Sequence, residues 1–371
     1  MNVETFAKTL GADFYAGVPD SLLRPLCDFL MKNFNPTRHI IAANEGNCAA
    51  IAAGYHLATG KIPVVYMQNS GEGNIVNPLA SLLNEKIYSI PMIFVIGWRG
   101  EPGVHDEPQH IFQGAITCEL LNLMGVKNFI VDKETSAAEL QAIMADYRKI
   151  LSAGSCVAFV IRKGALTYDE KISYKNSFNM RREEVLRKIV DVAAQDFIIA
   201  TTGKTGRELF EIREATTKNH AHDFLTVGSM GHCSSIALGL ALNRPEKIFW
   251  CIDGDGALMM HMGALAIIGA ARPKNLIHVV INNRAHESVG GMPTAAVDLI
   301  KIAQACGYVE TFKATSFDEL ENFLQQAKAV RDLTFIEVEC AIGSRKDLGR
   351  PTTTPAENKL HFMEALNDTQ I

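Results

Sequence analysis

The sequence lacks the features that mark several large classes of protein. Its eight cysteines include no CxxC pair, which argues against a zinc site and, in a reducing compartment, against disulfides. No apolar stretch approaches the roughly 20 residues that span a bilayer, and residues 1–5 show no cationic segment leading into an apolar one. We therefore expect a cytoplasmic protein without a membrane partner, in which most cysteines are small core residues.

A strong excess of one charge is also lacking. The formal net charge is -5, so the chain has no general attraction for nucleic acid. The basic pair Arg181-Arg182 fits a solvated helix start better than a binding stripe. With 371 residues, 47% of them hydrophobic and 21% charged, the chain is typical of a globular protein large enough for two cores.

The most informative feature that is present is Gly254-Asp255-Gly256, followed further along by Asn282-Asn283. The apolar runs Ile248–Ile252 and Leu276–Ile281 come before these two motifs and predict buried parallel strands. Residues 257–271, between the strands, have the length and composition of a helix. Because parallel strands end at one edge of their sheet, the two motifs are expected to lie close together, where α/β sheets bind ligands.

The two motifs supply hard oxygen ligands. Asp255, the Asn283 side chain and a nearby backbone carbonyl, for which Ala285 is the candidate, suit Mg²⁺ and leave positions that diphosphate oxygens usually fill. The glycine turn and the Asn pair at this spacing resemble the signature of thiamine diphosphate (ThDP) enzymes, which implies that Gly254 and Gly256 also border the cofactor. A tight glycine turn beside a loop Asn pair is the alternative.

An internal repeat supports two domains. Six of the twelve positions from Gly46 to Leu57 recur in Gly231–Leu242, and an apolar strand follows each segment. We predict two similar three-layer α/β domains with parallel sheets, a ThDP-binding fold, at 1–165 and 181–371. The polar stretch 166–180 between them is predicted to be a linker.

Glu45 is the candidate acid of the first, pyrimidine-binding domain. Asn44-Glu45-Gly46 lies where the strand Ile40-Ile41-Ala42 meets the repeated helix. ThDP chemistry needs a carboxyl bonded to the pyrimidine, because that bond favours the imino tautomer that removes the thiazolium proton. The alternative is a first-turn acid that the helix dipole favours.

Two further segments of the second, diphosphate-binding domain point to the cofactor. Thr202 and Gly203 end a strand and open a helix, a geometry that attracts phosphate. A P-loop is rejected because its first glycine would fall at Ile198. Resemblance to ThDP enzymes implies that the Gly228 carbonyl accepts from the cofactor's amino group and that Met230 props its bent shape, although such a Met is more often a core residue.

Nearly the whole chain resembles the compact family of phosphonopyruvate and sulfopyruvate decarboxylases. The shared stretches are Gly17–Ser21, Gln68–Asn74, Gly97–Gly103 with Asp106–His110, and Asn282–Ser288. The resemblance implies ThDP- and Mg²⁺-dependent conversion of 3-phosphonopyruvate to phosphonoacetaldehyde and CO₂, in the biosynthesis of 2-aminoethylphosphonate. The alternatives are a sulfopyruvate decarboxylase, another compact ThDP lyase or ligase, and a ThDP-binding protein without catalysis.

A phosphonate substrate needs cations that do not hold the leaving carboxylate too tightly. His286 is the candidate for protonating the intermediate, and the other candidates near the substrate are Asp20, Ser21, Arg99, His105, His110, Lys204 and Arg284. Each of these could equally be a surface, turn or helix-capping residue. The resemblance also implies a homo-oligomer, at least a dimer, in which Glu45 of one subunit and Asp255 of another serve one shared active site.

Overall fold

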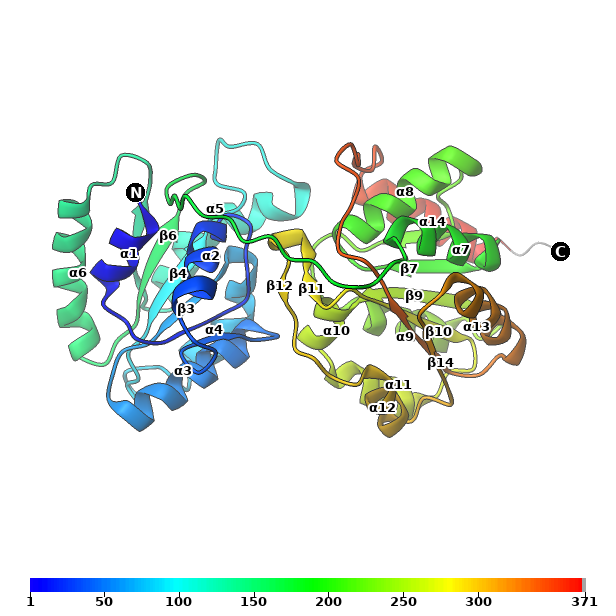
Figure 1. Cartoon of the computed structure of the whole chain (residues 1–371), viewed down its shortest axis with the longest axis horizontal. Coiled ribbons are helices and arrows are strands. Elements are labelled where there is room, and N and C mark those ends of the chain that lie inside the picture. Colours follow the sequence, from blue (N-terminus) through cyan, green and yellow to red (C-terminus); the bar gives the residue numbers. More distant parts are fainter. Residues whose placement is uncertain (369–371) are drawn as a thin grey trace. The chain divides into compact units, whose positions relative to one another are not determined.

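The computed structural model describes residues 1–368 and divides into two compact units (Figure 1). The first unit is Met1–Ser173 and the second begins at Tyr174. This division lies inside the stretch 166–180 that was predicted to be a linker. None of the helices among the described residues is long and apolar enough to cross a membrane.

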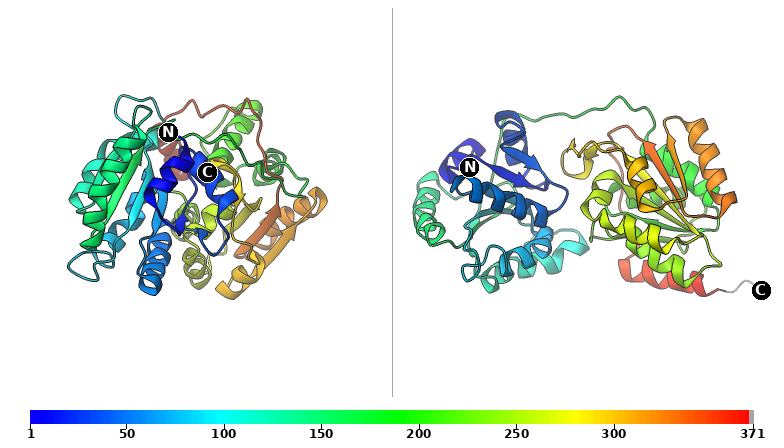
Figure 2. Two further views of the ribbon diagram at one scale, coloured as in Figure 1. Left: turned by 60° about the vertical axis from the view of Figure 1, so that its left-hand side comes forward. Right: turned by 90° about the horizontal axis from the view of Figure 1, so that it is seen from below.

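The first unit is built on a six-stranded parallel sheet in the order β2-β1-β3-β4-β6-β5. The strands are β1 (Tyr15–Gly17), β2 (His39–Ile41), β3 (Val64–Gln68), β4 (Ile93–Gly97), β5 (Lys127–Val131) and β6 (Val157–Ile161). The helices are α1 (Val3–Leu10), α2 (Arg24–Asn33), α3 (Glu45–Thr59), η1 (Asn69–Gly71), α4 (Glu72–Ala80), α5 (Pro108–Leu123) and α6 (Ala137–Ser152). Helices cover both faces of this sheet (Figure 2).

The second unit repeats this plan with the strand order β13-β14-β10-β9-β7-β8. Its strands are β7 (Phe197–Ala200), β8 (Asp223–Leu225), β9 (Phe249–Gly254), β10 (Leu276–Asn282), β13 (Glu310–Ala314) and β14 (Thr334–Glu339), with a separate pair β11 (Ala285–His286) and β12 (Met292–Pro293). Its helices are α7 (Arg182–Ala193), α8 (Lys204–Thr216), α9 (Cys233–Asn243), α10 (Asp255–Met260), α11 (Gly263–Ala271), η2 (Glu287–Val289), α12 (Leu299–Cys306), α13 (Phe317–Val330) and α14 (Pro355–Asn367).

Two apolar clusters fill the spaces between the layers of the second unit. Side chains from α7, α8 and α13 pack with one face of the sheet around Trp250. Side chains from α9, α11, α12 and α14 pack with the other face around Phe249. Alternate residues of β9 thus enter opposite clusters, as the period of a strand requires. The predicted fold class of two three-layer α/β domains is confirmed.

The prediction of a single helix over 257–271 is wrong. The structure has two helices, α10 and α11, because the backbone leaves helical geometry at His261 (φ -133°, ψ 45°). The His261 ring packs on that of His232 with centroids 4.2 Å apart. Gly231 approaches so closely that an added Cβ would lie 2.6 Å from the His261 ring. The break therefore accommodates the loop before α9.

Candidate cofactor site

The predicted cation ligands lie at one edge of the second sheet. Strand β9 ends in the glycine turn, β10 ends at Asn282, and the parallel register pairs Ile281 with Gly254. Asp255 and Asn283 are both buried. The Asp255 Oδ2 accepts a hydrogen bond of 2.6 Å from the Thr294 hydroxyl, which connects the turn to the segment after β12. Sequence reasoning missed Thr294 because nothing in its local pattern indicates this contact.

The chemistry of this donor set fits a hard cation. A carboxylate, a carboxamide and the nearby carbonyl of Ala285 are oxygen ligands of the kind that Mg²⁺ binds. Burial raises the pKa of Asp255 to about 6, so the carboxylate is costly to keep ionised without a positive partner. A bound cation would relieve that cost.

His286 lies directly beside the glycine turn. An added Cβ on Gly256 would come 3.2 Å from the His286 Nδ1, so a larger residue there would displace the ring by a few tenths of an ångström. Burial lowers the pKa of His286 to about 4. The imidazole is therefore neutral near pH 7, and a neutral ring can accept a proton or pass one on.

Two of the predicted cofactor segments meet at the neighbouring strands. The Gly228 N–H donates to the Thr202 hydroxyl at 3.2 Å. Gly203, which precedes α8, has a φ of 98°, and Gly228 has a φ of 71°, both in the region that favours glycine. Met230 is half-buried in the loop that follows.

Glu45 begins α3 in the first unit and is buried there. Its Oε2 accepts a hydrogen bond of 2.7 Å from the Asn74 side chain, and Asn44 caps the helix by accepting from the Gly46 N–H. Gly71 packs against this carboxyl so tightly that an added Cβ would lie 2.5 Å from its Cδ. Burial raises the pKa of Glu45, which favours a neutral carboxyl able to donate a proton to a ring nitrogen.

A second polar cluster in the first unit contains two of the predicted substrate residues. Asp20 is fully buried and accepts a hydrogen bond of 2.6 Å from the Gln68 amide. Burial raises the pKa of Asp20. Arg99 binds Asp106 through both arms of its guanidinium, one of them at 2.7 Å. Asn69 joins the cluster by donating to the Arg99 carbonyl at 2.8 Å. These residues follow the carboxyl ends of β1, β3 and β4.

The other predicted substrate residues do not all join this cluster. Ser21 and His105 are exposed. His110 is buried, and burial lowers its pKa. Arg284 lies over the Phe178 ring at 4.9 Å from its centroid, and Lys204 forms an ion pair of 2.9 Å with Glu287.

Glu287 was not predicted as a site residue, yet it contacts Asn283 directly. The Asn283 amide nitrogen donates to its Oε2 at 2.9 Å, and Arg182 binds the same oxygen at 2.8 Å. Burial alone would raise the pKa of Glu287, but Arg182 and Lys204 together lower it below its ordinary value. A buried anion is thus held beside the predicted cation ligand.

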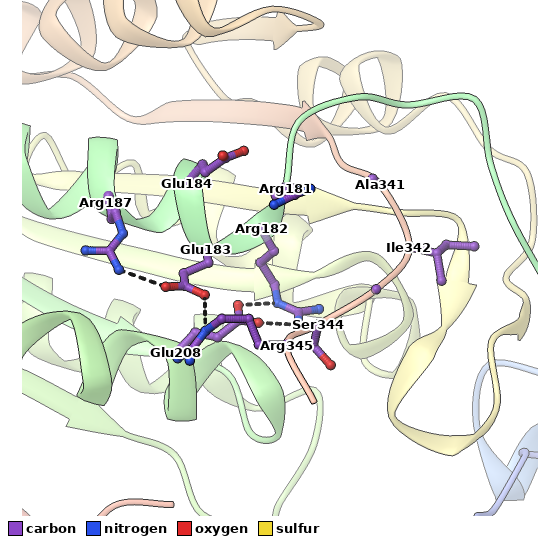
Figure 3. A pocket seen from close by; sticks show the side chains of 11 residues that line it. Arg181, Arg182, Glu183, Glu184, Arg187, Glu208, Ala341, Ile342, Ser344 and Arg345 are labelled. Atoms are coloured by element: carbon purple, nitrogen blue, oxygen red, sulfur yellow. Dashed lines mark hydrogen bonds and ion pairs between the residues drawn. The ribbon is translucent and has the colours of Figure 1, made fainter. Parts of the chain in front are cut away.

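A cavity of about 500 Å³ lies beside this network, between α7 and the segment after β14 (Figure 3). Its wall is rich in charge, and most of these charges pair with one another. Arg182 binds Glu208 at 2.7 Å, and Glu183 binds both Arg187 and Arg345. Carboxylates thus pair with three of the four arginines that line the cavity.

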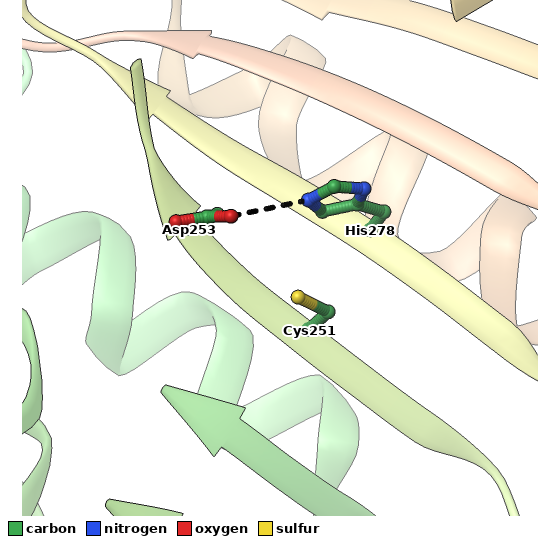
Figure 4. A group of neighbouring side chains, drawn as sticks. All are labelled: Cys251, Asp253 and His278. Atoms are coloured by element: carbon green, nitrogen blue, oxygen red, sulfur yellow. Dashed lines mark ion pairs between the residues drawn. The ribbon is translucent and has the colours of Figure 1, made fainter. Parts of the chain in front are cut away.

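Behind the glycine turn, Cys251, Asp253 and His278 offer ligand atoms within 4.8 Å of one another (Figure 4). Asp253 Oδ2 and His278 Nε2 face each other at 3.8 Å, and neither has a hydrogen-bond partner among the described residues. The other polar atoms of Asp253 and His278 are hydrogen-bonded: the Gly254 N–H donates to Asp253 Oδ1 at 2.9 Å, and His278 Nδ1 lies 2.9 Å from the Tyr308 hydroxyl. We therefore interpret the cluster as part of a buried polar network beneath the turn.

Comparisons with known proteins agree with this geometry. Residues 3–121 match the family described as "Thiamine pyrophosphate enzyme, N-terminal TPP binding domain", and residues 201–338 match the corresponding "C-terminal TPP binding domain". Fold and site together define a thiamine pyrophosphate enzyme, thiamine pyrophosphate being another name for ThDP.

Among thiamine pyrophosphate enzymes, the chain is similar to three decarboxylases over nearly its whole length. The phosphonopyruvate decarboxylase of Streptomyces viridochromogenes is 35% identical over 95% of this chain and 91% of its own length. That of Streptomyces hygroscopicus is 34% identical over 96% and 90%, and a sulfopyruvate decarboxylase of Methanosarcina acetivorans is 30% identical over 97% and 95%. The chain belongs to the phosphonopyruvate decarboxylase family and is an enzyme of the carboxy-lyase class. The resemblance predicted from the motifs is confirmed.

Proposed function

We propose that the enzyme converts 3-phosphonopyruvate to phosphonoacetaldehyde and CO₂, with ThDP and Mg²⁺, as a step in 2-aminoethylphosphonate biosynthesis. The observation that carries the proposal is the burial of the polar groups that the cofactor needs, an acid at Glu45 and oxygen ligands at Asp255 and Asn283. Similarity to two phosphonopyruvate decarboxylases over nearly the whole chain supports the choice of substrate.

Residues of the second unit would hold the cofactor's charged end. Asp255, the Asn283 side chain and the Ala285 carbonyl would bind Mg²⁺, and Thr202 and Gly203 lie where a strand ends and a helix begins, a place suited to phosphate. Gly228 and Met230 would border the rest of the cofactor. ThDP, when bound, supplies the carbon nucleophile and accepts the electrons that decarboxylation releases.

Glu45 would hold a proton on the pyrimidine. Its buried carboxyl has a raised pKa, so it can share a proton with a ring nitrogen instead of remaining a free carboxylate. Asn74 fixes the direction of one carboxyl oxygen. His286, neutral beside the glycine turn, would relay a proton to the product carbon, taking up a proton from solvent at one ring nitrogen as it releases one from the other.

The phosphonate would be bound by cations that now pair with carboxylates. Arg99 is held by Asp106 and Lys204 by Glu287, and a phosphonate could share either of them through charge-assisted hydrogen bonds. Further candidates for binding the substrate are Arg284, His105 and His110. Asp20 and Ser21 would border the substrate near Arg99. This arrangement would leave the substrate carboxylate weakly held, as decarboxylation requires.

We further propose a homo-oligomer, at least a dimer, in which Glu45 of one subunit and Asp255 of another serve one active site. The support is the resemblance to ThDP enzymes and the placement of the two groups in separate compact units.

The proposal is tested by product formation from phosphonopyruvate, sulfopyruvate and pyruvate in parallel. Aldehyde and CO₂ are measured with ThDP and Mg²⁺, without ThDP, and with EDTA. Cofactor-dependent turnover that favours phosphonopyruvate is expected. Faster turnover of sulfopyruvate would favour the second candidate function, a sulfopyruvate decarboxylase, which the 30% identical relative supports. The absence of cofactor-dependent turnover with all three acids would contradict the proposed reaction.

A further inference from the structure

The environment of Glu287 extends the proposed function, on which this inference rests. Glu287 lies in η2, and its side chain is only 9% exposed. It has three cationic or amide donors around one carboxylate. Its Oε2 accepts from the Asn283 side chain at 2.9 Å and from Arg182 at 2.8 Å, and its Oε1 accepts from Lys204 at 2.9 Å.

This contact decides which way the Asn283 carboxamide faces. A carboxylate only accepts hydrogen bonds, so it selects the NH₂ end of a neighbouring amide. The Asn283 Oδ1 accepts from the Ala285 N–H at 3.0 Å and keeps a second lone pair. If the amide were rotated by half a turn, its oxygen would face the Glu287 carboxylate and its NH₂ group would take the place of the metal-binding oxygen.

Glu287 is itself held in place by two cations. Arg182 is 6% exposed and binds Glu208 with both arms at 2.7 and 2.8 Å, while its third nitrogen reaches Glu287. Lys204 approaches from the start of α8. Two carboxylates and two cations thus balance, which removes the large cost of burying a single anion. The network fixes Glu287 from two helices that lie outside the cation-binding segment.

We propose that Glu287 is a positioning residue of the cation site, which orients the Asn283 oxygen toward the metal and is held for this purpose by Arg182 and Lys204. Metal affinity is expected to depend on it, because groups that orient a ligand typically change affinity about 10- to 100-fold when they are removed. Lys204 has a defined role in this network whether or not it also contacts substrate.

The test measures binding of Mn²⁺, a substitute for Mg²⁺, to the ThDP-saturated protein from the electron paramagnetic resonance signal of free Mn²⁺. Glu287→Ala is expected to raise the dissociation constant about 10- to 100-fold, and Glu287→Gln by less, since its amide oxygen can still accept from Asn283. Glu183→Gln is the matched control, because it removes an ion-pairing carboxylate of α7 that contacts Arg187 and Arg345 instead. It should bind Mn²⁺ as the unaltered enzyme does.

A double-mutant cycle separates positioning from general destabilisation. If Glu287 acts through Asn283, Glu287→Ala should have little further effect on Mn²⁺ binding in an Asn283→Ala background. Relative to the unaltered enzyme, the Glu287 variants should lose more turnover at limiting Mg²⁺ than at saturating Mg²⁺. If Glu287→Ala does not fold, the Glu287→Gln variant carries the same comparison.

The outcomes distinguish this inference from the proposed function. An unaltered enzyme that bound no Mn²⁺ with ThDP present would overturn the cation site and this inference with it. Normal binding by the unaltered enzyme, with an unchanged constant for folded Glu287→Ala and Glu287→Gln, would overturn the inference alone. So would an effect of Glu287→Ala that is equally large in the Asn283→Ala background.

Discussion

At the scale of single residues, the buried carboxyl of Glu45 gives a direct test of the chemistry. Glu45→Gln keeps the size of the side chain and its place at the start of α3, but removes the acidic proton. We expect turnover to fall by about 10²- to 10⁴-fold, the usual contribution of a positioned acid or base. ThDP affinity, followed by titration of the cofactor's circular dichroism, should change far less. Unchanged turnover would rule out the role assigned to Glu45.

Glu72 gives a prediction about stability and pH. Its side chain is buried, and its Oε1 has no hydrogen-bond partner within the described part of the chain. Burial raises its pKa from 4.5 to about 8. Between these values the folded protein binds more protons than the unfolded one, so the free energy of unfolding should fall as pH rises from about 4.5 to about 8.

Glu72→Gln should remove this contribution. The free energy of unfolding of the variant minus that of the unaltered enzyme is expected to be larger at pH 8 than at pH 5, by up to a few kcal/mol. Urea unfolding at the two pH values measures the difference. An equal effect of the substitution at both pH values would show that Glu72 does not keep its proton in the folded state.

The residues of the proposed cation site differ in how far the sequence could predict them. Asp255 and Asn283 were predicted because their types and spacing, after two apolar runs, indicate oxygen ligands at the ends of parallel strands. Glu287 was not predicted, and the prediction that Arg182 lies at a solvated helix start is wrong, because Arg182 is 6% exposed and pairs with Glu208 and Glu287. The contact between Arg182 and Glu287 joins positions 105 residues apart. Such a contact depends on how α7 packs against the sheet, and no local pattern records it.

At the scale of secondary-structure elements, η1 controls the space around Glu45. Gly71→Ala would bring a Cβ within 2.5 Å of the Glu45 side chain, so the carboxyl must move. We expect a loss of turnover of at least about tenfold, because small misplacements of a catalytic group are costly. Steady-state kinetics with saturating ThDP would measure it.

Gly73→Ala is the control for this substitution. An added Cβ at Gly73 meets no atom within 4 Å, and alanine is favoured over glycine in a helix by about 0.5–1 kcal/mol. This variant should be as active as the unaltered enzyme and at least as stable. Similar losses in both variants would show that the effect arises from α4 rather than from the contact with Glu45.

The predictability of elements follows their burial. Strands β9 and β10 are buried along almost their whole length, and their apolar runs were predicted with ends that agree within two residues. Strand β13 was not predicted, because only its last residue is buried and its sequence is largely polar. The break between α10 and α11 was also missed, since it depends on the contacts of His261 with a loop from elsewhere in the chain.

At the scale of the whole molecule, the internal repeat has a structural counterpart. Gly46–Leu57 lies in α3, and Gly231–Leu242 includes the loop before α9 and nearly all of that helix. Each helix leads into a strand of its own sheet, β3 in one unit and β9 in the other. Two copies of one α/β plan thus carry different chemistry, with an acid at the start of one helix and a glycine loop before the other.

Because Glu45 and Asp255 lie in different units, the proposed shared active site predicts complementation between two inactive variants. Glu45→Gln and Asp255→Ala should each be inactive alone. In a mixed dimer, one site would carry both substitutions and the other neither, so a random mixture should regain about one quarter of full activity. Co-expression with two different affinity tags, followed by sequential purification and assay, would isolate the mixed oligomer. If each subunit instead built its site from its own Glu45 and Asp255, every site in the mixture would contain one substitution and activity would stay at the level of the separate variants.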